Sequence, residues 1–373
     1  MKSEIFIICT TDSMILSFLV PYIKAFEKMG FRVRCVCSRT GDHFDKLEKL
    51  GIQLEEMEFT RNPFTISNIK AYIQLRKTIR YSNAKLVFCH EPVGGVMGRL
   101  VGKRWNIPVV YMAHGFHFYH KAPLINWMIF YPIEKIMSYL TNVLITINTE
   151  DYKLAQKRMK AQKTVFLAGV GVDIEQYDSV QYDRDKKRKE LEIPKNAFVL
   201  ISVGELNENK NHTVILDALH ESKIKNAYYL IAGVGNQDKK LMEKAETYGI
   251  DLRLLGYRRD CAELYAASDV FCFPSYREGL SVALMEAMAS GLPVIASKIR
   301  GNVDLIDKEG GILVDPSDIN SFKDALERMW YNEDIRKQYG VHNKKKVMNY
   351  SIKEVLPKFM CEIKHLQMEE NNV

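Results

Sequence analysis

The sequence has few cysteines, and their spacing suits neither a disulfide framework nor a zinc site. Its 373 residues contain seven cysteines, which is an odd number. Most of them lie in apolar runs typical of buried strands, namely Cys9, Cys35, Cys37, Cys89 and Cys272. We therefore interpret the cysteines as reduced, small hydrophobic residues of a cytosolic protein.

Long apolar segments are also missing. The longest candidate, Leu124–Leu140, is interrupted by Pro132 and carries charged residues, so we expect no membrane-spanning helix. The first twenty residues include Glu4 and Asp12, and no small-residue cleavage site follows them. We therefore expect no secretory signal.

The composition is otherwise that of an ordinary globular protein, with 47% hydrophobic and 27% charged residues. It excludes disorder, collagen and coiled coil as the main state. Residues 1–175 carry 24 Lys and Arg against 15 Asp and Glu, whereas the remaining residues carry 29 against 31. The excess positive charge in the first half indicates either an anionic partner or a solvated basic face.

Short β-branched runs alternate with helical patterns along the whole chain. The runs EIFIIC, RVRCVC, LVFCH, PVVYMAH, VLITIN and TVFLAG come first, and FVLISVGE, YYLIAGVG, LRLLG, VFCFPS, PVIAS and GILVD follow. Such patterns predict an α/β protein with two doubly wound parallel sheets, each binding ligands at the carboxyl ends of its strands. A charged linker or surface helix is expected near residues 177–194. The predicted domains are residues 1–175, 176–349 and a C-terminal helix and tail, 350–373.

The segment REGLSVALMEAMASGLPVIAS, residues 277–297, is the most informative. Its apolar spacing predicts a helix over Gly279–Leu292 with a single charge, Glu286. A helix without a polar face is normally buried, and a buried carboxylate needs compensation. Protein donors or ligand hydroxyls, such as those of a ribose, are the two open alternatives for Glu286.

Glu278 lies just before this predicted helix. If the helix begins at Gly279, then the backbone N–H groups of Gly279, Leu280 and Ser281 have no intrahelical partner and form a site for an anion such as diphosphate. Alternatively, Glu278 is only an N-terminal acid that suits the helix dipole.

These strings together resemble glycosyltransferase family 4. The E-x7-E pattern is followed by GG-I-LVDP at Gly310–Pro316, and residues 203–219, 232–241 and 254–275 also fit. Residues 112–135 are similar to the bacterial branch that builds capsules and exopolysaccharides. The resemblance implies a GT-B fold, in which two Rossmann-like domains face a cleft, and a C-terminal helix that returns to the N-terminal domain.

The resemblance also implies a donor site in the second domain. Glu286 would bind the ribose, Glu278 the transferred sugar, and Lys210 the diphosphate, whose negative charge grows as the glycosidic bond breaks. Amides of Gly279, Leu280 and Ser281 would contact sugar or phosphate. Further nucleotide-sugar-binding residues would be Gly204, Tyr257 and Arg259, with Leu255 bordering the base.

One position departs from the family pattern. Many members carry an arginine as a second phosphate clamp at the position of Glu205. Either Arg258 or Arg259 compensates for this acid, or Glu205 has another role.

In the first domain, His114 matches a family histidine that approaches the reacting sugar, so the implied catalytic residues are Glu278, His114 and Lys210. The alternative for His114 is a packed structural histidine. His117 and His120 suggest a metal only weakly, because no convergent carboxylate is evident. The loop after the first strand is atypical for the family, and Thr10, Thr11 and Asp12 are expected to face the cleft.

The implied reaction is transfer of a hexosyl or N-acetylhexosaminyl unit from a nucleotide sugar, expected to be UDP-linked, with retention and without metal or prosthetic group. The expected acceptor is polyprenyl-diphosphate-linked or a saccharide. A cytoplasmic protein, peripheral on the inner face of the membrane, is expected. The aromatic and basic segment His117–Tyr139 would then dock on an anionic membrane, although an ordinary core helix is the alternative.

Three other readings compete with a glycosyltransferase. A nucleotide-sugar epimerase of the same fold would bind the same donor, and a non-catalytic subunit of a polysaccharide assembly would share the architecture. Nucleic-acid binding has only the positive charge in its favour, without a recognisable motif, so no nucleic-acid partner is expected.

Overall fold

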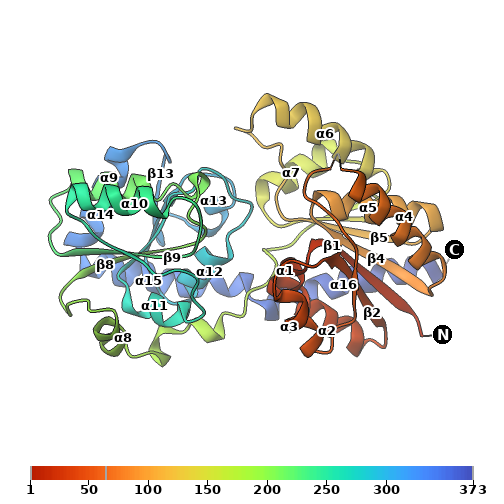
Figure 1. The fold of residues 1–373 in the computed structure, drawn as a ribbon, viewed down its shortest axis with the longest axis horizontal. Coiled ribbons are helices and arrows are strands. Elements are labelled where there is room, and N and C mark those ends of the chain that lie inside the picture. Colours follow the sequence, from red (N-terminus) through yellow and green to blue (C-terminus); the bar gives the residue numbers. More distant parts are fainter. Residues whose placement is uncertain (1, 64, 372–373) are drawn as a thin grey trace. The chain divides into compact units, whose positions relative to one another are not determined.

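The computed structural model describes residues 2–63 and 65–371, which form two compact units (Figure 1). Unit 1 comprises the chain up to Gly171 together with residues from Val355 onward, and unit 2 is Val172–Glu354. Both are parallel sheets covered by helices on both faces. The predicted α/β class is therefore confirmed for each unit.

Unit 1 is built on a seven-stranded parallel sheet in the order β3-β2-β1-β4-β5-β6-β7. The strands are β1 (Glu4–Thr11), β2 (Arg32–Ser38), β3 (Leu54–Glu56), β4 (Ala84–His90), β5 (Val109–Ala113), β6 (Val143–Thr146) and β7 (Lys163–Phe166). Six of them coincide with predicted apolar runs. The edge strand β3 was not predicted because it is short, carries two glutamates and is only partly buried.

The helices of unit 1 cover both faces of this sheet (Figure 1). They are α1 (Asp12–Met14), α2 (Val20–Lys28), α3 (His43–Lys49), α4 (Ile66–Arg80), α5 (Pro92–Trp105), α6 (Leu124–Ser138), α7 (Thr149–Arg158) and α16 (Ile352–Asn371). A π-helical segment, Ile15–Leu19, joins α1 to α2. Among the described residues, no helix is both long and apolar enough to cross a membrane.

Helix α16 ends the chain and packs on unit 1, as the fold class predicted. Phe359 on α16 is fully buried, and its ring centroid lies 4.9 Å from those of Tyr22 and Phe88 and 5.8 Å from that of Phe26. This aromatic cluster joins the end of the chain to α2 and β4, so residues far apart in sequence share one core.

Helix α5 approaches the sheet of unit 1 unusually closely. A Cβ atom at Gly102 would lie 2.1 Å from Cγ2 of Val109, and one at Gly95 would lie 2.5 Å from Cε2 of Tyr111. Only glycine fits at such distances. The glycine side of α5 is therefore held against β5.

Unit 2 has a six-stranded parallel sheet in the order β10-β9-β8-β11-β12-β13. The strands are β8 (Phe198–Val203), β9 (Ala227–Ala232), β10 (Asp251–Leu254), β11 (Val270–Phe273), β12 (Val294–Ser297) and β13 (Gly311–Val314). The helices are α8 (Arg184–Glu190), α9 (Thr213–Glu221), α10 (Asp238–Tyr248), α11 (Cys261–Ala267), α12 (Val282–Ala289), α13 (Asn302–Leu305), α14 (Ile319–Tyr331) and α15 (Glu333–Val347). All six strands coincide with predicted runs. Short 3-10 helices occur at Glu175–Tyr177, Ser179–Gln181, Glu208–Lys210 and Met348–Tyr350.

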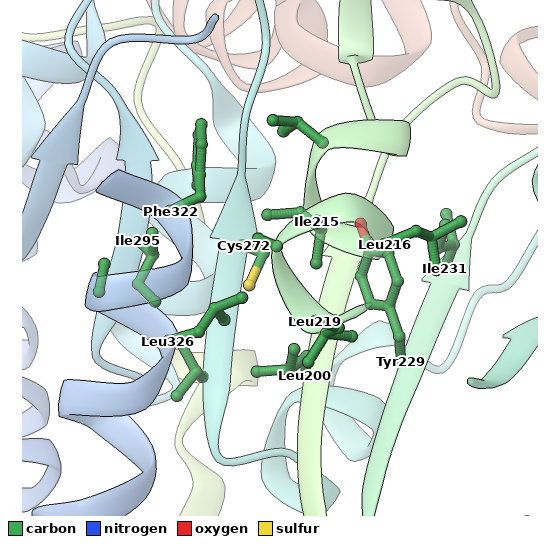
Figure 2. Packing of buried hydrophobic residues seen from close by; sticks show 14 of the residues in the cluster. Leu200, Ile215, Leu216, Leu219, Tyr229, Ile231, Cys272, Ile295, Phe322 and Leu326 are labelled. Atoms are coloured by element: carbon green, nitrogen blue, oxygen red, sulfur yellow. The ribbon is translucent and has the colours of Figure 1, made fainter. Parts of the chain in front are cut away.

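The core of unit 2 lies between this sheet and the helices α9 and α14 (Figure 2). Fully buried side chains from both helices interlock with those of four strands. They are Ile215, Leu216, Phe322 and Leu326 from the helices, and Leu200, Tyr229, Ile231, Cys272 and Ile295 from the strands. Cys272 is a free thiol in this core, as expected of a cysteine used as a small hydrophobe.

The charged stretch at residues 177–194 is anchored to unit 2. Arg188 on α8 is buried, and its guanidinium donates to Asp269 Oδ2 at 2.9 Å and to the carbonyl oxygen of Ala267 at 2.8 Å. A buried arginine with these partners fixes α8 against α11. Of the two expected alternatives, a linker or a surface helix, the segment therefore contains a helix, α8, and this helix is anchored by a buried side chain.

In both sheets the strand that comes first in the sequence lies between the second and the fourth strand of the same sheet. In unit 2, β8 therefore has β9 on one side and β11 on the other. In unit 1, β1 has β2 on one side and β4 on the other. Loops at the carboxyl ends of such strands diverge to opposite faces and leave a crevice, which is where ligands bind in doubly wound sheets.

Candidate active site

The crevice of unit 2 contains two of the residues that were predicted to be catalytic. Lys210 follows β8 and Glu278 follows β11, and these two strands are neighbours in the sheet. Lys210 Nζ donates to Glu278 Oε1 at 2.7 Å and also lies 4.8 Å from the centroid of the Phe273 ring. The structure thus brings together a cation and a carboxylate that are 68 residues apart in sequence.

Hydrogen bonds to backbone carbonyl oxygens join the two loops that carry this ion pair. The Asn209 side chain donates to the carbonyl oxygen of Arg277 at 3.0 Å, and the Tyr276 amide donates to the carbonyl oxygen of Asn209 at 2.8 Å. Asn207 caps the 3-10 helix by accepting from the Lys210 amide at 3.1 Å. Lys210 is therefore held at a defined position above the strand ends rather than on a free loop.

Two close backbone approaches also shape this crevice. A Cβ at Gly233 would lie 1.8 Å from the carbonyl oxygen of Gly204, and one at Gly301, whose φ is +79°, would lie 2.2 Å from that of Gly279. Glycine is required at Gly233 and Gly301, because any side chain there would push the adjacent loop away. The predicted ligand residues Gly204 and Gly279 are thus positioned by other glycines.

The helix that follows Glu278 is shorter than the sequence predicted. Helix α12 spans Val282–Ala289, and Ser281 is its N-cap, with its side chain accepting from the Leu284 amide at 3.3 Å. The expectation of a helix over Gly279–Leu292 was therefore wrong at both ends. Gly279 and Leu280 belong to the loop before the cap, so their amides are not the first N–H groups of the helix.

Glu286 has protein partners on both carboxylate oxygens. Tyr177 donates to Oε1 at 2.7 Å and Tyr265 donates to Oε2 at 3.1 Å. Burial raises the pKa of the Glu286 carboxyl, and the two tyrosine hydrogen bonds oppose that rise. Since a carboxylate accepts about four hydrogen bonds, Glu286 keeps acceptor capacity for further hydroxyl groups.

The other residues assigned to this site have diverse surroundings. Glu205 is exposed and accepts from the Asn207 side chain at 2.7 Å. Arg258 is committed to Asp260, with its Nε 2.7 Å from Oδ1. Arg259 is exposed, and it makes no hydrogen bond or ion pair within the described part of the chain. Arg259 is therefore the better candidate of the two to compensate for Glu205.

Tyr257 and Leu255 follow β10 at the same edge of the sheet. Tyr257 is 73% exposed, whereas Leu255 is partly buried. A large exposed aromatic ring beside the strand ends is suited to stacking on a base. No protein contact fixes the Tyr257 ring among the interactions of the described residues.

At the equivalent strand ends of unit 1, the Glu91 carboxylate links two loops. The sequence analysis did not identify this residue. Glu91 follows β4, and its Oε2 accepts from the amides of Thr10 and Thr11, at the end of β1, at 2.8 and 3.3 Å. The φ of Glu91 is +59°, a conformation that non-glycine residues adopt rarely. Burial raises the pKa of Glu91, and the Thr10 and Thr11 amides oppose that rise.

Asp12 was expected to face the cleft, but its carboxylate accepts hydrogen bonds from a loop of unit 1. It is fully buried, and its Oδ2 accepts from the Thr40 amide at 2.8 Å while the Thr40 hydroxyl donates to Oδ1. These two hydrogen bonds tie the end of β1 to the loop after β2. The position of Asp12 is therefore explained by the fold alone.

His114 is paired with a second histidine, His90, at the carboxyl ends of two adjacent strands. The His90 Nδ1 and His114 Nε2 atoms are 3.0 Å apart. Burial lowers the pKa of His114 to about 4 and that of His90 well below its usual value, so both rings are neutral at pH 7. One proton therefore lies between the two nitrogens.

The surroundings of His90 decide which ring holds this proton. His90 Nε2 is buried without a hydrogen-bond partner among the described residues. A buried N–H without an acceptor is rarer and costlier than an unused lone pair, so we assign the proton to His90 Nδ1. His114 then accepts at Nε2 and carries its own proton at Nδ1.

The remaining histidines of this loop have structural contacts. The His117 ring lies 4.5 Å from that of Phe130, and the His120 amide donates to Glu150 Oε1 at 2.7 Å. No group of three His, Cys, Asp or Glu side chains in the described ranges is arranged to hold a metal ion. His117 and His120 are thus part of the loop that leads into α6.

Three partners in these sites were missed by the sequence analysis. His90 ends the predicted strand LVFCH, and the neighbouring predicted strand PVVYMA precedes His114, so their adjacency in a parallel sheet was a usable signal. Tyr177 and Tyr265 gave no such signal, because they are 109 and 21 residues from Glu286 and lie on separate elements.

Two Rossmann-like units, the second with a lysine and carboxylates at the crevice of its sheet, define the architecture of a GT-B glycosyltransferase. Comparison with known families agrees with this class. The family "Glycosyl transferase 4-like" matches residues 8–148, and "Glycosyl transferases group 1" matches residues 183–346.

Individual relatives extend over most of the chain. It is 32% identical to the Bacillus subtilis protein EpsD over 94% of this chain and 93% of that protein. EpsD is named as a glycosyltransferase. It is 29% identical to the UDP-Gal:alpha-D-GlcNAc-diphosphoundecaprenol alpha-1,3-galactosyltransferase of Escherichia coli, over 80% of each chain. The crystal structure of Anabaena HepE in complex with UDP has a TM-score of 0.80 at 18% identity, covering 98% of this chain and 100% of that one.

The chain therefore belongs to glycosyltransferase family 4, and it is a glycosyltransferase of the GT-B fold. This conclusion confirms the family resemblance in the sequence.

The tautomer assignment predicts the behaviour of two His90 variants. In the wild type, the 15N chemical shifts of His114 are expected to show a proton on Nδ1. His90→Asn should preserve this tautomer, because the asparagine amide nitrogen can occupy the place of the histidine Nδ1 and donate to His114. His90→Leu should let His114 populate both tautomers. A wild-type spectrum with the proton on His114 Nε2 would refute the assignment.

Proposed function

We propose that the protein is a retaining glycosyltransferase that transfers a hexosyl or N-acetylhexosaminyl unit from a UDP-linked donor to an acceptor hydroxyl in bacterial capsule or exopolysaccharide biosynthesis. The observation that carries this proposal is the Lys210–Glu278 pair at the crevice of unit 2. The acceptor is a lipid-linked or saccharide molecule bound by unit 1. UDP as donor nucleotide is supported by the name of the Escherichia coli relative and by the UDP in the HepE structure.

Lys210 is assigned to the leaving diphosphate. Its ammonium has three N–H donors, and Glu278 is its one hydrogen-bond acceptor among the described residues. The two remaining donors can bind phosphate oxygens. Because the diphosphate gains negative charge as the glycosidic bond breaks, a fixed cation at this place stabilises the transition state more than the bound donor.

Glu278 is assigned to the hydroxyls of the transferred sugar. In the free protein its charge is balanced by Lys210 at 2.7 Å. When a diphosphate binds Lys210, part of that interaction is exchanged, and the carboxylate becomes a stronger acceptor for neighbouring hydroxyls. The pair thus couples occupation of the phosphate site to recognition of the sugar.

Glu286 is assigned to the ribose of the nucleotide. The two tyrosine hydroxyls keep the carboxylate oriented, and its remaining acceptor positions suit a pair of adjacent hydroxyls. The sequence left protein donors and ligand hydroxyls as alternative partners of Glu286. The carboxylate can accept hydrogen bonds from both at the same time.

Transfer is proposed to proceed on one face of the sugar, with the leaving diphosphate accepting the proton of the acceptor hydroxyl. This scheme uses Lys210 as the permanent positive charge and requires neither metal nor prosthetic group. The neutral His114 donates a hydrogen bond from Nδ1 to an oxygen of the acceptor, because its Nε2 is engaged by His90. It therefore orients the substrate rather than removing a proton.

The acceptor side is proposed to be peripheral on the inner face of the cell membrane. Helix α6 exposes Leu124, Ile125 and Met128, with exposed fractions of 81%, 56% and 72%. Lys121, which precedes the helix, is also exposed. Apolar side chains next to lysine on a surface helix suit adsorption to an anionic bilayer, where a polyprenyl-linked acceptor resides.

The ribose assignment predicts a loss of donor binding in Glu286→Gln, which keeps the shape and one oxygen acceptor for the tyrosines. In a thermal-shift screen of nucleotide sugars, one donor at a hundredfold excess over its Kd should raise the wild-type Tm by about 5 °C or more. We expect Glu286→Gln to lose most of this shift. Glu246→Gln, the same change at an exposed acid on α10 of unit 2, is the control, and an unreduced shift in Glu286→Gln contradicts the assignment.

The role of Lys210 predicts a large effect on turnover. Lys210→Met removes the charge but keeps most of the side-chain volume, and kcat should fall by more than about tenfold. Lys244→Met is the matched control. Lys244 lies on α10, away from the strand ends, and is ion-paired at 2.7 Å to Asp217 on α9. Near-normal turnover in the Lys210 variant would remove this residue from the mechanism.

Membrane association is tested by cosedimentation with anionic vesicles. Binding is expected at low salt and should weaken at high salt, since screening reduces the attraction of surface charges. The double variant Leu124→Glu and Met128→Glu should lose most of the binding, whereas Val341→Glu, at a 71% exposed valine of unit 2, should not. Absence of wild-type binding at low salt would exclude the membrane as a partner.

A further inference from the structure

Unit 1 contains a cavity of about 480 Å³ between helices α5 and α6, which we call the α5–α6 cavity. Its walls are largely apolar and come from both helices and from the loop after β5. They include Val93, Val96 and Met97 of α5, and Phe130 and Ile133 of α6. Its volume lies within the range of about 300–1,000 Å³ that is usual for small-molecule sites.

A buried ion pair holds this cavity open. Arg99 on α5 is fully buried and donates to Glu134 on α6 through two bonds of 2.8 and 2.9 Å. Its guanidinium also lies 4.0 Å above the Tyr111 ring. Because moving α6 closer would break a bidentate pair of buried charges, the two helices cannot simply collapse onto each other.

The two ends of the cavity differ in chemistry. Glu91 and His114, at the carboxyl ends of β4 and β5, lie in its lining together with Arg61. The Glu91 carboxylate accepts from the Thr10 and Thr11 amides through Oε2 and, with up to four acceptor positions, can accept further donors, and His114 Nδ1 carries a proton by the assignment above. This end can therefore accept and donate hydrogen bonds, and Arg61 adds a positive charge.

Helix α6 connects the cavity to the exposed apolar surface of the same unit. Phe130 and Ile133 face the cavity, whereas Leu124 and Met128 of the same helix are exposed. A saccharide would bring many hydroxyls that the apolar walls cannot satisfy. The complementary ligand is an amphiphile with an apolar chain and a polar, phosphorylated head.

We propose that the α5–α6 cavity binds the first isoprenoid units of a lipid-linked acceptor, with the head group at the end formed by Arg61, Glu91 and His114. This proposal rests on the proposed function and selects the lipid-linked acceptor over a free saccharide. Burial of the chain supplies binding free energy without hydrogen bonds, and the polar end fixes the direction in which the head group points.

Binding is tested without any transfer reaction. Farnesyl phosphate is titrated into the wild-type protein by calorimetry, with inorganic phosphate as the chain-free probe. Farnesyl phosphate should bind at least about tenfold more tightly than inorganic phosphate, because only the former has a chain to bury. Equal affinity for the two would overturn the proposal.

Two substitutions at the half-buried Val96 probe the cavity itself. Val96→Phe fills it and should weaken farnesyl phosphate binding by about tenfold or more, whereas Val96→Ala keeps the cavity open and should retain binding. Val341→Phe, the same change at an exposed valine of unit 2, is the matched control. A wild-type circular dichroism spectrum and an unchanged Tm without ligand show that each variant is folded, and wild-type affinity for farnesyl phosphate in Val96→Phe would refute the site.

A transfer assay separates this inference from the proposed function. The same sugar diphosphate is offered as acceptor with a farnesyl chain and with a methyl group, and kcat/KM is measured for both. The farnesyl acceptor should be favoured in the wild type, and Val96→Phe should remove this preference by lowering kcat/KM for the farnesyl acceptor. Equal use of both acceptors by the wild type would overturn the chain site but leave the glycosyltransferase intact, whereas transfer to neither would count against the proposed function.

Discussion

The carboxyl ends of two adjacent parallel strands, where the chain turns to opposite faces of the sheet, are the constraint on which both candidate sites depend. In unit 2 this place is occupied by the ion pair between Lys210, after β8, and Glu278, after β11. Neither residue has a role in the core of the sheet. Their contact instead fixes two loops over the crevice, and the proposal that diphosphate and sugar bind to this unit rests on the charges that the pair places there.

Unit 1 meets the same constraint with different chemistry. The Glu91 carboxylate, which follows β4, accepts hydrogen bonds from the amides of Thr10 and Thr11 at the end of β1. These hydrogen bonds, rather than an ion pair, join the two loops. The amides at the end of β1 are thereby satisfied internally, and no fixed cation lies within this contact. This difference agrees with a division of labour in which unit 2 binds a diphosphate and unit 1 binds an acceptor through hydrogen bonds and apolar contacts.

The sequence predicted most of the fold because buried parallel strands are continuous apolar runs, and only the short acidic strand β3 lacked that signal. It also singled out Lys210, Glu278 and Glu286 as candidates, since all three belong to recognisable strings, and the structure brings Lys210 and Glu278 together at the strand ends. It misplaced the start of α12, because apolar spacing continues through Gly279 and Leu280 although Ser281 caps the helix. The partners of Glu286 and His114 escaped prediction because they depend on which elements become neighbours, which periodicity along one segment does not report.

Buried charge alone does not distinguish a binding group from a structural one, but the number of satisfied donors does. Arg99 and Arg188 are more deeply buried than Lys210, yet their guanidinium groups are bound by carboxylates and backbone carbonyls on several sides. Lys210 has one carboxylate partner for three donors and remains 18% exposed at the strand ends. An arginine with its donors filled stabilises helix packing, whereas a fixed lysine with donors to spare retains the capacity to bind an anion. Desolvation of the kind that burial of Glu286 indicates would strengthen that interaction, because charges attract more strongly where water is excluded.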